Sequence, residues 1–268
     1  MAIPHALPEP SDDWALFLDV DGTLIEIAEA PDEVSVDPEM IGVLARLDDR
    51  FDGALALVSG RELATLDRLF RPLRLTAAGL HGLERRTPRG EIQKPNGTAA
   101  QLDRVRRELH AFAAGDAGLL VEDKGLTVAL HFRRSPACAG DVRDLADRLG
   151  AEIGGALILQ RGKMVIEFRP PGPNKGDVAE QFMAEPPFAG RVPVFIGDDV
   201  TDEDGFAAVN RLHGHSIRIG PKEPTAARWH IASVAELRDW LAALADGEAG
   251  SAREPNSSTQ HGSRHEQP

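Results

Sequence analysis

Short apolar runs alternate with amphipathic segments along most of this 268-residue chain. The runs Trp14–Val20, Ala54–Val58 and Val192–Ile196 are apolar at nearly every position and not at every second one. A continuous apolar run is typical of a strand buried on both faces, and such strands belong to parallel sheets that helices cover. The pattern predicts an α/β fold whose core is a Rossmann-like parallel sheet with helices on both faces.

Start signals mark the helices between these runs. Asp37 followed by Pro38 is an N-cap with proline at the first helical position, and it predicts a helix to about Asp49. Ser233, with a glutamate three residues later, begins the last helix as a capping box. Two more helices of this pattern are expected at 61–70 and 202–209, and one more strand is expected at 216–219.

The middle of the chain follows a different pattern. Strands at 119–124, 126–133, 157–160 and 163–169 alternate apolar and polar residues, and helices are expected at 98–114 and 136–149. Alternation predicts sheets with one apolar and one polar face. We therefore expect an α+β cap domain at 88–170, inserted into a core made of 13–87 and 171–246. The Pro-rich residues 1–12 are predicted to be a flexible arm, and 247–268, with no apolar residue larger than alanine, a disordered tail.

Composition narrows the possible partners. Hydrophobic residues make up 42% of the chain, enough for a sizeable core, and Lys+Arg 30 against Asp+Glu 43 gives a net charge of −13. A chain this acidic repels polyanions, which disfavours nucleic acid and anionic membrane surfaces. The single Cys138 excludes a disulfide framework and a multi-cysteine metal site. We expect a cytoplasmic protein with a small-molecule ligand, and nothing in the sequence points to an obligate protein partner.

Two acidic clusters follow apolar runs directly. Asp19 and Asp21 stand one residue apart before Gly22, at the end of the first run. Close carboxylates repel, so either one is protonated or a cation lies between them; the alternative is a polar strand end with an Asp-Gly turn. Asp198 begins a second cluster of five acids in seven residues, which a hard cation or a lysine would offset. A solvated helix start explains the acids from Asp202 to Asp204 equally well, but Asp198 less well.

Two further residues lie where phosphate is commonly bound. Ser59 follows the second run, and with Glu62 it fits a capping box, the interpretation that this short motif favours by itself; a phosphate cradle is the alternative. Lys175 opens a predicted helix. A cation is unfavourable at that end of a helix dipole, which points to a bound anion.

The order Asp-x-Asp-Gly-Thr, Ser, Lys, Gly-Asp-Asp resembles the haloacid dehalogenase superfamily of phosphohydrolases. Longer strings resemble the bacterial type of trehalose-6-phosphate phosphatases: Gly60-Arg61, Gly79–Glu84, Glu167-x-Arg169-Pro170 and Gly197–Phe206. The resemblance spans roughly residues 14 to 245 and implies a phosphoric monoester hydrolase with a cap domain.

The resemblance also implies roles for individual residues. Asp19 is expected to be the nucleophile that carries an aspartyl-phosphate, and Asp21 the general acid and then base. Mg²⁺ would be held by Asp19, Asp21 and Asp198, while Asp199 and Asp202 would orient waters or Lys175 around it. Ser59 and Lys175 would hold phosphoryl oxygens.

Substrate specificity is expected to come from the cap. Strand periodicity places Glu122 with Lys124 on one face, His131 with Arg133 on the next strand, and Glu167 on a third. Paired charges supply the donors and acceptors that sugar hydroxyls need, although a merely solvated face is an equal alternative without the resemblance. The substrate contacts that the resemblance implies are Glu122, Lys124, Arg133, Lys163 and Glu167 from the cap, with Gly60, Arg61, His81 and Glu84 from the core near the hinge.

The leading hypothesis is hydrolysis of trehalose 6-phosphate to trehalose and phosphate with Mg²⁺ as cofactor. A related phosphatase for another sugar phosphate is one alternative, because the core would be identical. A non-catalytic sugar-phosphate-binding regulator is the other, and the intact Asp19, Asp21, Ser59, Lys175 and Asp198 argue against it.

Overall fold

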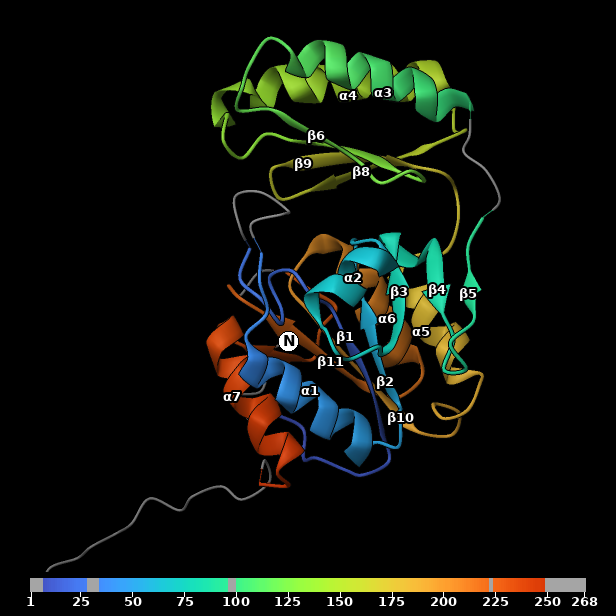
Figure 1. Ribbon diagram of the computed structural model, residues 1–268, viewed down its shortest axis with the longest axis vertical. Helices are drawn as coiled ribbons and strands as arrows, with labels where there is room; N and C mark the ends of the chain where they lie inside the picture. The colour runs from blue at the N-terminus through green and yellow to red at the C-terminus, as the bar shows by residue number, and fades with distance from the viewer. Residues whose placement is uncertain (1–6, 28–33, 96–99, 222–223, 249–268) are drawn as a thin grey trace, which may run out of the picture.

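The computed structural model describes residues 7–27, 34–95, 100–221 and 224–248. It contains an eight-stranded sheet with helices and, stacked on one end of it, a four-stranded sheet with two helices of its own (Figure 1). The predicted α/β core with an inserted α+β cap is confirmed. Within the described ranges, none of the helices is long and apolar enough to cross a membrane.

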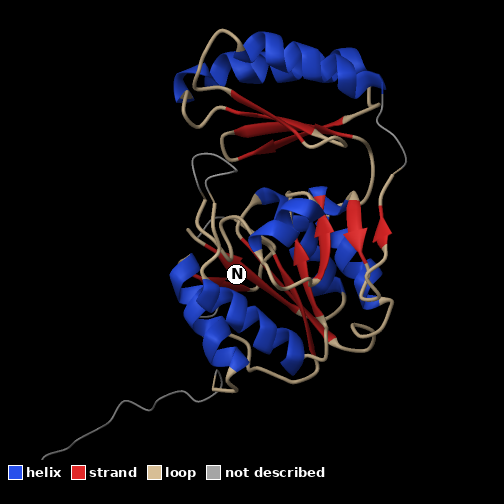
Figure 2. Cartoon of the chain, in the orientation of Figure 1, coloured by secondary structure: helices blue, strands red, loops and turns tan. Residues whose placement is uncertain are grey.

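The core sheet has the strand order β12-β11-β10-β1-β2-β3-β4-β5 (Figure 2). The first six strands in this order are parallel to their neighbours, and β4 and β5 are antiparallel additions at one edge. Its strands are β1 (Trp14–Leu18), β2 (Leu55–Val58), β3 (Thr76–Gly79), β4 (Glu84–Arg86), β5 (Ile92–Gln93), β10 (Val192–Gly197), β11 (His215–Ile219) and β12 (Trp229–Ile231).

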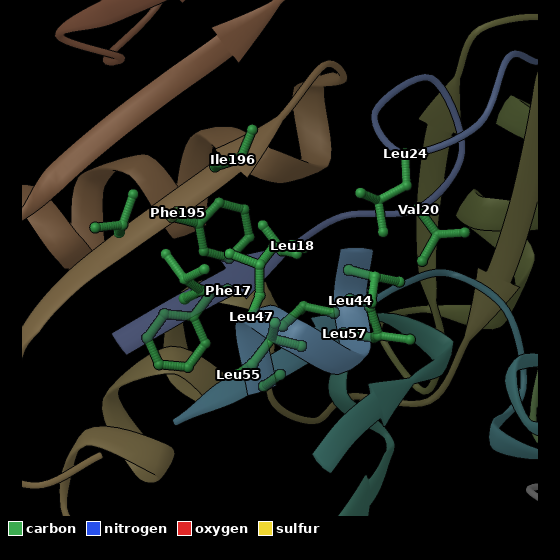
Figure 3. Close-up of a cluster of buried hydrophobic side chains, with 14 of the residues drawn as sticks. Phe17, Leu18, Val20, Leu24, Leu44, Leu47, Leu55, Leu57, Phe195 and Ile196 are labelled. Atoms are coloured by element: carbon green, nitrogen blue, oxygen red, sulfur yellow. The ribbon is translucent and has the colours of Figure 1, made fainter. Parts of the chain in front are cut away.

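Helices cover both faces of the core sheet because its central strands are apolar on both sides. The ring centroid of Trp14 in β1 lies 6.2 Å from that of Trp240 in α7. Phe17, on the opposite face of the same strand, lies 6.2 Å from Phe182 in α5. Figure 3 shows Leu18 among the buried leucines of α1 and β2. The core helices are α1 (Pro38–Arg50), α2 (Leu63–Leu69), α5 (Lys175–Met183), α6 (Glu203–Arg211) and α7 (Val234–Ala245).

The cap sheet has the antiparallel order β6-β7-β9-β8. Its elements are α3 (Ala100–Ala113), β6 (Leu120–Asp123), β7 (Val128–His131), η2 (Pro136–Cys138), α4 (Ala139–Ile153), β8 (Ile158–Gly162) and β9 (Val165–Arg169). Leu130, Ile166 and Phe168 pack under the two helices in a separate hydrophobic cluster. The helices lie on the outer face of this sheet, and its other face is turned toward the core (Figure 1). The prediction of one apolar and one polar face is confirmed.

Helix caps that depend on neighbouring residues form as expected. The side chain of Asp37 accepts the backbone N–H of Glu39, and the Ser233 hydroxyl accepts that of Glu236. The reciprocal half of the predicted capping box differs, because the Glu236 carboxylate accepts the backbone N–H of Ala232 and not that of Ser233. The three strands β3, β4 and β5 have two to four residues each and show no periodicity that predicts them. Because β5 pairs with β4, the core sheet continues to Gln93, beyond the boundary expected after residue 87.

The predicted arm and tail lie largely outside the described residues, which omit 1–6 and 249–268. Leu7 lies inside them and packs against the hydrophobic core. At the other end, the backbone N–H of Glu248 donates to the carbonyl of Ala243, so residues after α7 continue its hydrogen bonding for a short distance.

Candidate active site

The candidate site lies where three neighbouring parallel strands end. β10, β1 and β2 are adjacent in the sheet, and the residues that follow them are Asp198, Asp19 and Ser59. Parallel strands present their carboxyl ends at one edge, which is where open α/β sheets bind ligands. Lys175, the first residue of α5, reaches the same edge. The topology therefore brings together residues that the sequence separates by more than a hundred positions.

Asp19 is buried and both of its carboxylate oxygens accept hydrogen bonds. Lys175 Nζ lies 2.7 Å from Oδ1, and the Thr23 hydroxyl donates to Oδ2 at 3.0 Å. Lys175 Nζ also lies 2.7 Å from Asp202 Oδ1. Burial alone would lower the pKa of Lys175, but the two carboxylates raise it above its usual value, so the lysine stays charged.

Asp19, Asp198 and Asp202 form a cluster whose ligand atoms all lie within 4.8 Å of one another. Burial, followed by repulsion from Asp202, raises the pKa of Asp19 well above its usual value and that of Asp198 to about 7. A single ammonium group therefore does not neutralise these carboxylates.

Two observations at Asp198 fit a hard divalent cation. Its Oδ1 is buried and has no hydrogen-bond partner among the described residues. Gly22 has a φ of +83°, and a Cβ at that position would lie 2.2 Å from Asp198 Oδ2. The turn after β1 thus leaves room for this carboxylate beside Asp19. Carboxylate oxygens in such a cluster are the donors that Mg²⁺ prefers.

Asp202 is not part of a solvated helix start, one of the alternatives for the acidic segment. Its side chain is fully buried. Oδ2 accepts the backbone N–H groups of Asp198 and Asp199, both at 3.0 Å, while Oδ1 binds Lys175. Asp202 therefore holds both the lysine and the turn that carries Asp198. Of the two acids that follow it in this cluster, Glu203 is half-buried and Asp204 is exposed.

Asp21 forms a two-point ion pair with the core residue Arg61. The guanidinium donates to its two oxygens at 2.7 and 2.6 Å. A bidentate pair of this kind fixes the orientation of the carboxylate as well as its position. Both side chains line the cavity between the core and the cap.

Ser59 and Glu84 are placed differently from what their motifs suggest. The capping box of Ser59 with Glu62 does not form: α2 begins after Glu62, and the Ser59 hydroxyl accepts the backbone N–H of Arg61 at 3.1 Å. Glu84 supplies an acceptor for that helix instead, at 2.9 Å from the backbone nitrogen of Leu63. Neither Ser59 nor Glu84 is among the residues that line the cavity.

The cavity brings most of the predicted residues together. Those that line it are Asp19, Asp21, Gly60, Arg61, His81, Glu122, Lys124, Arg133, Lys163, Glu167, Lys175, Asp198 and Asp199. Its wall also contains four residues without a predicted role: Ile27, Val34, His131 and Val165. Ser59, Glu84 and Asp202 are the predicted residues that lie behind the wall. His131 has a sequence signal, since it shares a strand face with Arg133, whereas Ile27 and Val34 have none.

Glu167 is the most constrained carboxylate on the cap side. Its Oε1 accepts hydrogen bonds from the buried Thr127 hydroxyl at 2.5 Å and from Lys124 Nζ at 3.4 Å. Its Oε2 lies 3.2 Å from His81 Nε2. Burial would raise its pKa, but the charge of Lys124 and the hydrogen bonds from His81 and Thr127 hold the pKa of Glu167 well below its usual range. Glu167 is therefore ionised.

Polar contacts join the cap to the core around this carboxylate. His81 comes from the core and has a left-handed backbone with a φ of 56°. Its Nε2 lies 3.2 Å from Glu167 and 3.0 Å from the amide of Gln160, both in the cap. In the opposite direction, Lys124 donates to the carbonyl of Gly60 at 3.2 Å. Burial lowers the pKa of His81, which favours its neutral form.

Comparisons with known proteins agree with this geometry. The family profile described as trehalose-phosphatase matches residues 17–236. The "probable trehalose-phosphate phosphatase" of Sinorhizobium fredii (strain NBRC 101917 / NGR234) is 48% identical over 241 residues, which cover 90% of this chain and 91% of that protein. The trehalose-6-phosphate phosphatase of Escherichia coli (strain K12) is 43% identical over 237 residues, covering 87% of each.

A solved structure supports the fold. The C-terminal domain of a C. albicans trehalose-6-phosphate phosphatase superposes with a TM-score of 0.78, covering 87% of this chain and 92% of that one. At 21% identity this likeness concerns the fold alone. The fold of this solved structure, the family match and the two relatives are all consistent with the motifs at the strand ends. The chain belongs to the trehalose-phosphatase family.

Proposed function

We propose that this protein hydrolyses trehalose 6-phosphate to trehalose and phosphate. One observation carries the proposal: Asp19, Lys175 and Asp198 face the same cavity as the charged side of the cap sheet. A phosphoryl group at the strand ends would then leave the attached sugar between core and cap. The E. coli relative is named a trehalose-6-phosphate phosphatase and the S. fredii relative a probable trehalose-phosphate phosphatase, which supports this choice of substrate.

The chemistry proposed for the core requires two displacements at phosphorus. In the first, an Asp19 oxygen forms a bond to phosphorus while the bond from phosphorus to the sugar oxygen breaks, and Asp21 in its protonated form, which requires its release from Arg61, gives that oxygen its proton. In the second, Asp21 takes a proton from water, the water oxygen binds phosphorus, and Asp19 is released. The Thr23 hydroxyl supports this role by orienting Asp19.

Lys175 and Ser59 are proposed to hold phosphoryl oxygens. The charge of Lys175 is supported by its two carboxylate partners, Asp19 and Asp202, which outweigh the opposing effect of burial. A buried ammonium group beside phosphorus stabilises the negative charge of the transferring group more strongly than a solvated one. Ser59 lies at the adjacent strand end, where its hydroxyl oxygen accepts the backbone N–H of Arg61, and this bond leaves the O–H group to donate to a phosphoryl oxygen.

Mg²⁺ is proposed as the cofactor, held by the carboxylates of Asp19 and Asp198 and by the backbone carbonyl of Asp21. The unpartnered Oδ1 of Asp198 and the lack of space for any side chain at Gly22 support this assignment. When bound, the ion neutralises charge on the phosphoryl oxygens and on the carboxylates. Asp199 lines the cavity and is proposed to orient waters around the ion, whereas Asp202 acts through Lys175 and the backbone.

Recognition of the sugar is proposed to rest on charged side chains. Among the described residues, no Phe or Trp lines the cavity, and the chain contains no Tyr. Sugar rings therefore find no large aromatic face to stack on there. Hydroxyl groups would instead bind the charged residues of the cap face, which are Glu122, Lys124, Arg133, Lys163 and Glu167.

Phosphate release from a panel of sugar phosphates, measured with Mg²⁺ and with EDTA, tests the proposal. We expect the highest kcat/KM for trehalose 6-phosphate and loss of activity in EDTA that added Mg²⁺ restores. Higher kcat/KM for another sugar phosphate would contradict the substrate assignment. Release from none of them would contradict the enzyme assignment and favour a regulator.

The role of the cap has its own test. We expect Glu167→Ala to raise KM for trehalose 6-phosphate while kcat/KM for a small aryl phosphate changes far less, because that substrate has no sugar. A matched control is Glu108→Ala on the outer cap helix α3, which leaves the cavity untouched. Equal losses on both substrates would contradict a role in sugar recognition.

A further inference from the structure

His131 on the cap lines the cavity and contacts Glu122, one of the two carboxylates that the cap contributes to it. Its Nε2 lies 2.7 Å from Glu122 Oε2, closer than Lys124 Nζ, which is 3.6 Å away. Burial would raise the pKa of Glu122, but the His131 hydrogen bond and the charge of Lys124 lower it below its usual value. An ionised carboxylate has no proton to donate, so His131 Nε2 is the donor in this bond.

The sheet brings these two side chains together. Glu122 in β6 is opposite Ala129 in β7, and His131 is opposite Leu120. His131 and Glu122 are therefore diagonal neighbours on the cavity face, a separation that long side chains can span. His131 is also opposite Val165 in β9, so its backbone is held by strands on both sides.

Lys124 by itself holds Glu122 only loosely, because it is shared among three acceptors. Its Nζ lies 3.2 Å from the carbonyl of Gly60, 3.4 Å from Glu167 and 3.6 Å from Glu122. The contact to Glu122 is the longest of the three. A glutamate side chain has several rotamers, and ordering one on binding costs free energy unless it is already held.

The other cap carboxylate does not depend on His131. Glu167 is held by the hydroxyl of Thr127, by Lys124 and by His81 from the core. The Thr127 hydroxyl lies only 2.5 Å from Glu167. Glu122 and Glu167 thus share Lys124. Each also has partners of its own, which are His131 for Glu122 and Thr127 and His81 for Glu167. A substitution at His131 should therefore change the orientation of Glu122 and leave the contacts of Glu167 in place.

We propose that His131 is a positioning residue that presets Glu122 to accept a hydrogen bond from a sugar hydroxyl of the substrate. This inference rests on the proposed sugar-phosphate phosphatase function and extends its specificity site beyond the five charged cap residues. His131 acts through Glu122 and takes no part in the displacement at phosphorus. Its loss therefore weakens binding of the sugar and leaves the chemistry of small phosphates intact.

The test compares three substitutions of His131. His131→Gln keeps an N–H donor at the reach of Nε2, His131→Asn carries one too short to reach Glu122, and His131→Leu has none. We expect the Leu and Asn variants to raise KM for trehalose 6-phosphate about tenfold, the effect of losing one hydrogen bond to a charged group. The KM of the Gln variant should stay within about threefold of the wild-type value. For p-nitrophenyl phosphate, kcat/KM should change by less than about twofold.

Controls separate positioning from structural damage and from direct contact. His110→Leu, on the exposed side of α3, makes the same side-chain change outside the cavity and should leave both substrates unaffected. In a Glu122→Ala background, His131→Leu should raise KM no further, because the residue it positions is gone. If His131→Leu fails to fold, the contrast between Asn and Gln decides the question.

Three results would overturn the inference: an unchanged KM in the Leu and Asn variants, equal losses on both substrates, or additive effects with Glu122→Ala. A wild-type protein that prefers another sugar phosphate would contradict the proposed substrate alone. The His131 series is then measured on that preferred substrate, with the same expectations. A wild-type protein that hydrolyses p-nitrophenyl phosphate but no sugar phosphate would overturn both.

Discussion

Removing the buried carboxylate of Asp202 should destabilise the protein even though the residue lies outside the cavity wall. In Asp202→Ala, Lys175 loses one of its two carboxylates, and the backbone N–H groups of Asp198 and Asp199 lose their acceptor. A hydrogen bond to a charged group contributes about 1.5–3 kcal/mol, and each N–H left without a partner costs about 1 kcal/mol at a half-buried position.

Relief of repulsion offsets part of this loss, because Asp202 raises the pKa of both Asp19 and Asp198. Each unit of pKa corresponds to about 1.4 kcal/mol, so we expect a net loss of about 2–4 kcal/mol. For a chain of this size that is a fall in Tm of about 4–16 °C. Asp202→Asn should be nearly as damaging, since its neighbours are all donors and its amide nitrogen must face some of them.

Urea unfolding in EDTA measures this effect without a contribution from metal binding to the native state. Asp204→Ala is the matched control, because Asp204 is an exposed acid two residues further along. We expect it to change the free energy of unfolding by less than about 0.5 kcal/mol. An Asp202→Ala variant within about 1 kcal/mol of the wild type would refute the reasoning, as would equal losses in the two variants.

Three other predictions follow from the site. Asp19→Asn should lower phosphate release roughly a thousandfold or more while the protein keeps its fold, because the nucleophile is lost at nearly constant volume; residual turnover near the wild-type value would exclude Asp19 as nucleophile. Gly22→Ala places a Cβ 2.2 Å from Asp198 Oδ2 and should weaken Mg²⁺ binding, measured by calorimetric titration; unchanged affinity would remove Asp198 from the metal site. Glu167 has a lowered pKa when folded, so its ionised form stabilises the protein above the unfolded pKa of about 4.3 and this stability is lost as pH falls. The difference in unfolding free energy between wild type and Glu167→Gln should therefore be constant above about pH 6 and shrink below about pH 4, and a difference that grows on acidification would contradict it.

Features that depend on residues close together in the chain were predictable. The N-caps at Asp37 and Ser233 form as their local motifs indicate. The alternation of strands in the middle of the chain correctly separated the cavity face of the cap from the face under its helices. Such patterns report a local backbone geometry, and that geometry determines which side chains share a face.

Features that depend on partners distant in the chain were not predictable from the sequence. Ser59 and Glu62 match a capping motif, yet the helix that follows takes its acceptor from Glu84 across the sheet. Asp202 matches a solvated helix start, yet it is fully buried against Lys175. In both cases a contact between separate elements replaced the local interaction that the sequence favoured.

The sequence by itself determined the order of elements, the two faces of the cap sheet and the motifs that mark the family. Only the tertiary structure decided which charges meet: Asp21 with Arg61, Asp202 with Lys175, and Glu122 with His131. The physical reason is that electrostatic and hydrogen-bond energies fall steeply with distance and rise with burial. Periodicity along a chain specifies direction within one element, but the separation and burial of groups on different elements exist only once those elements have packed.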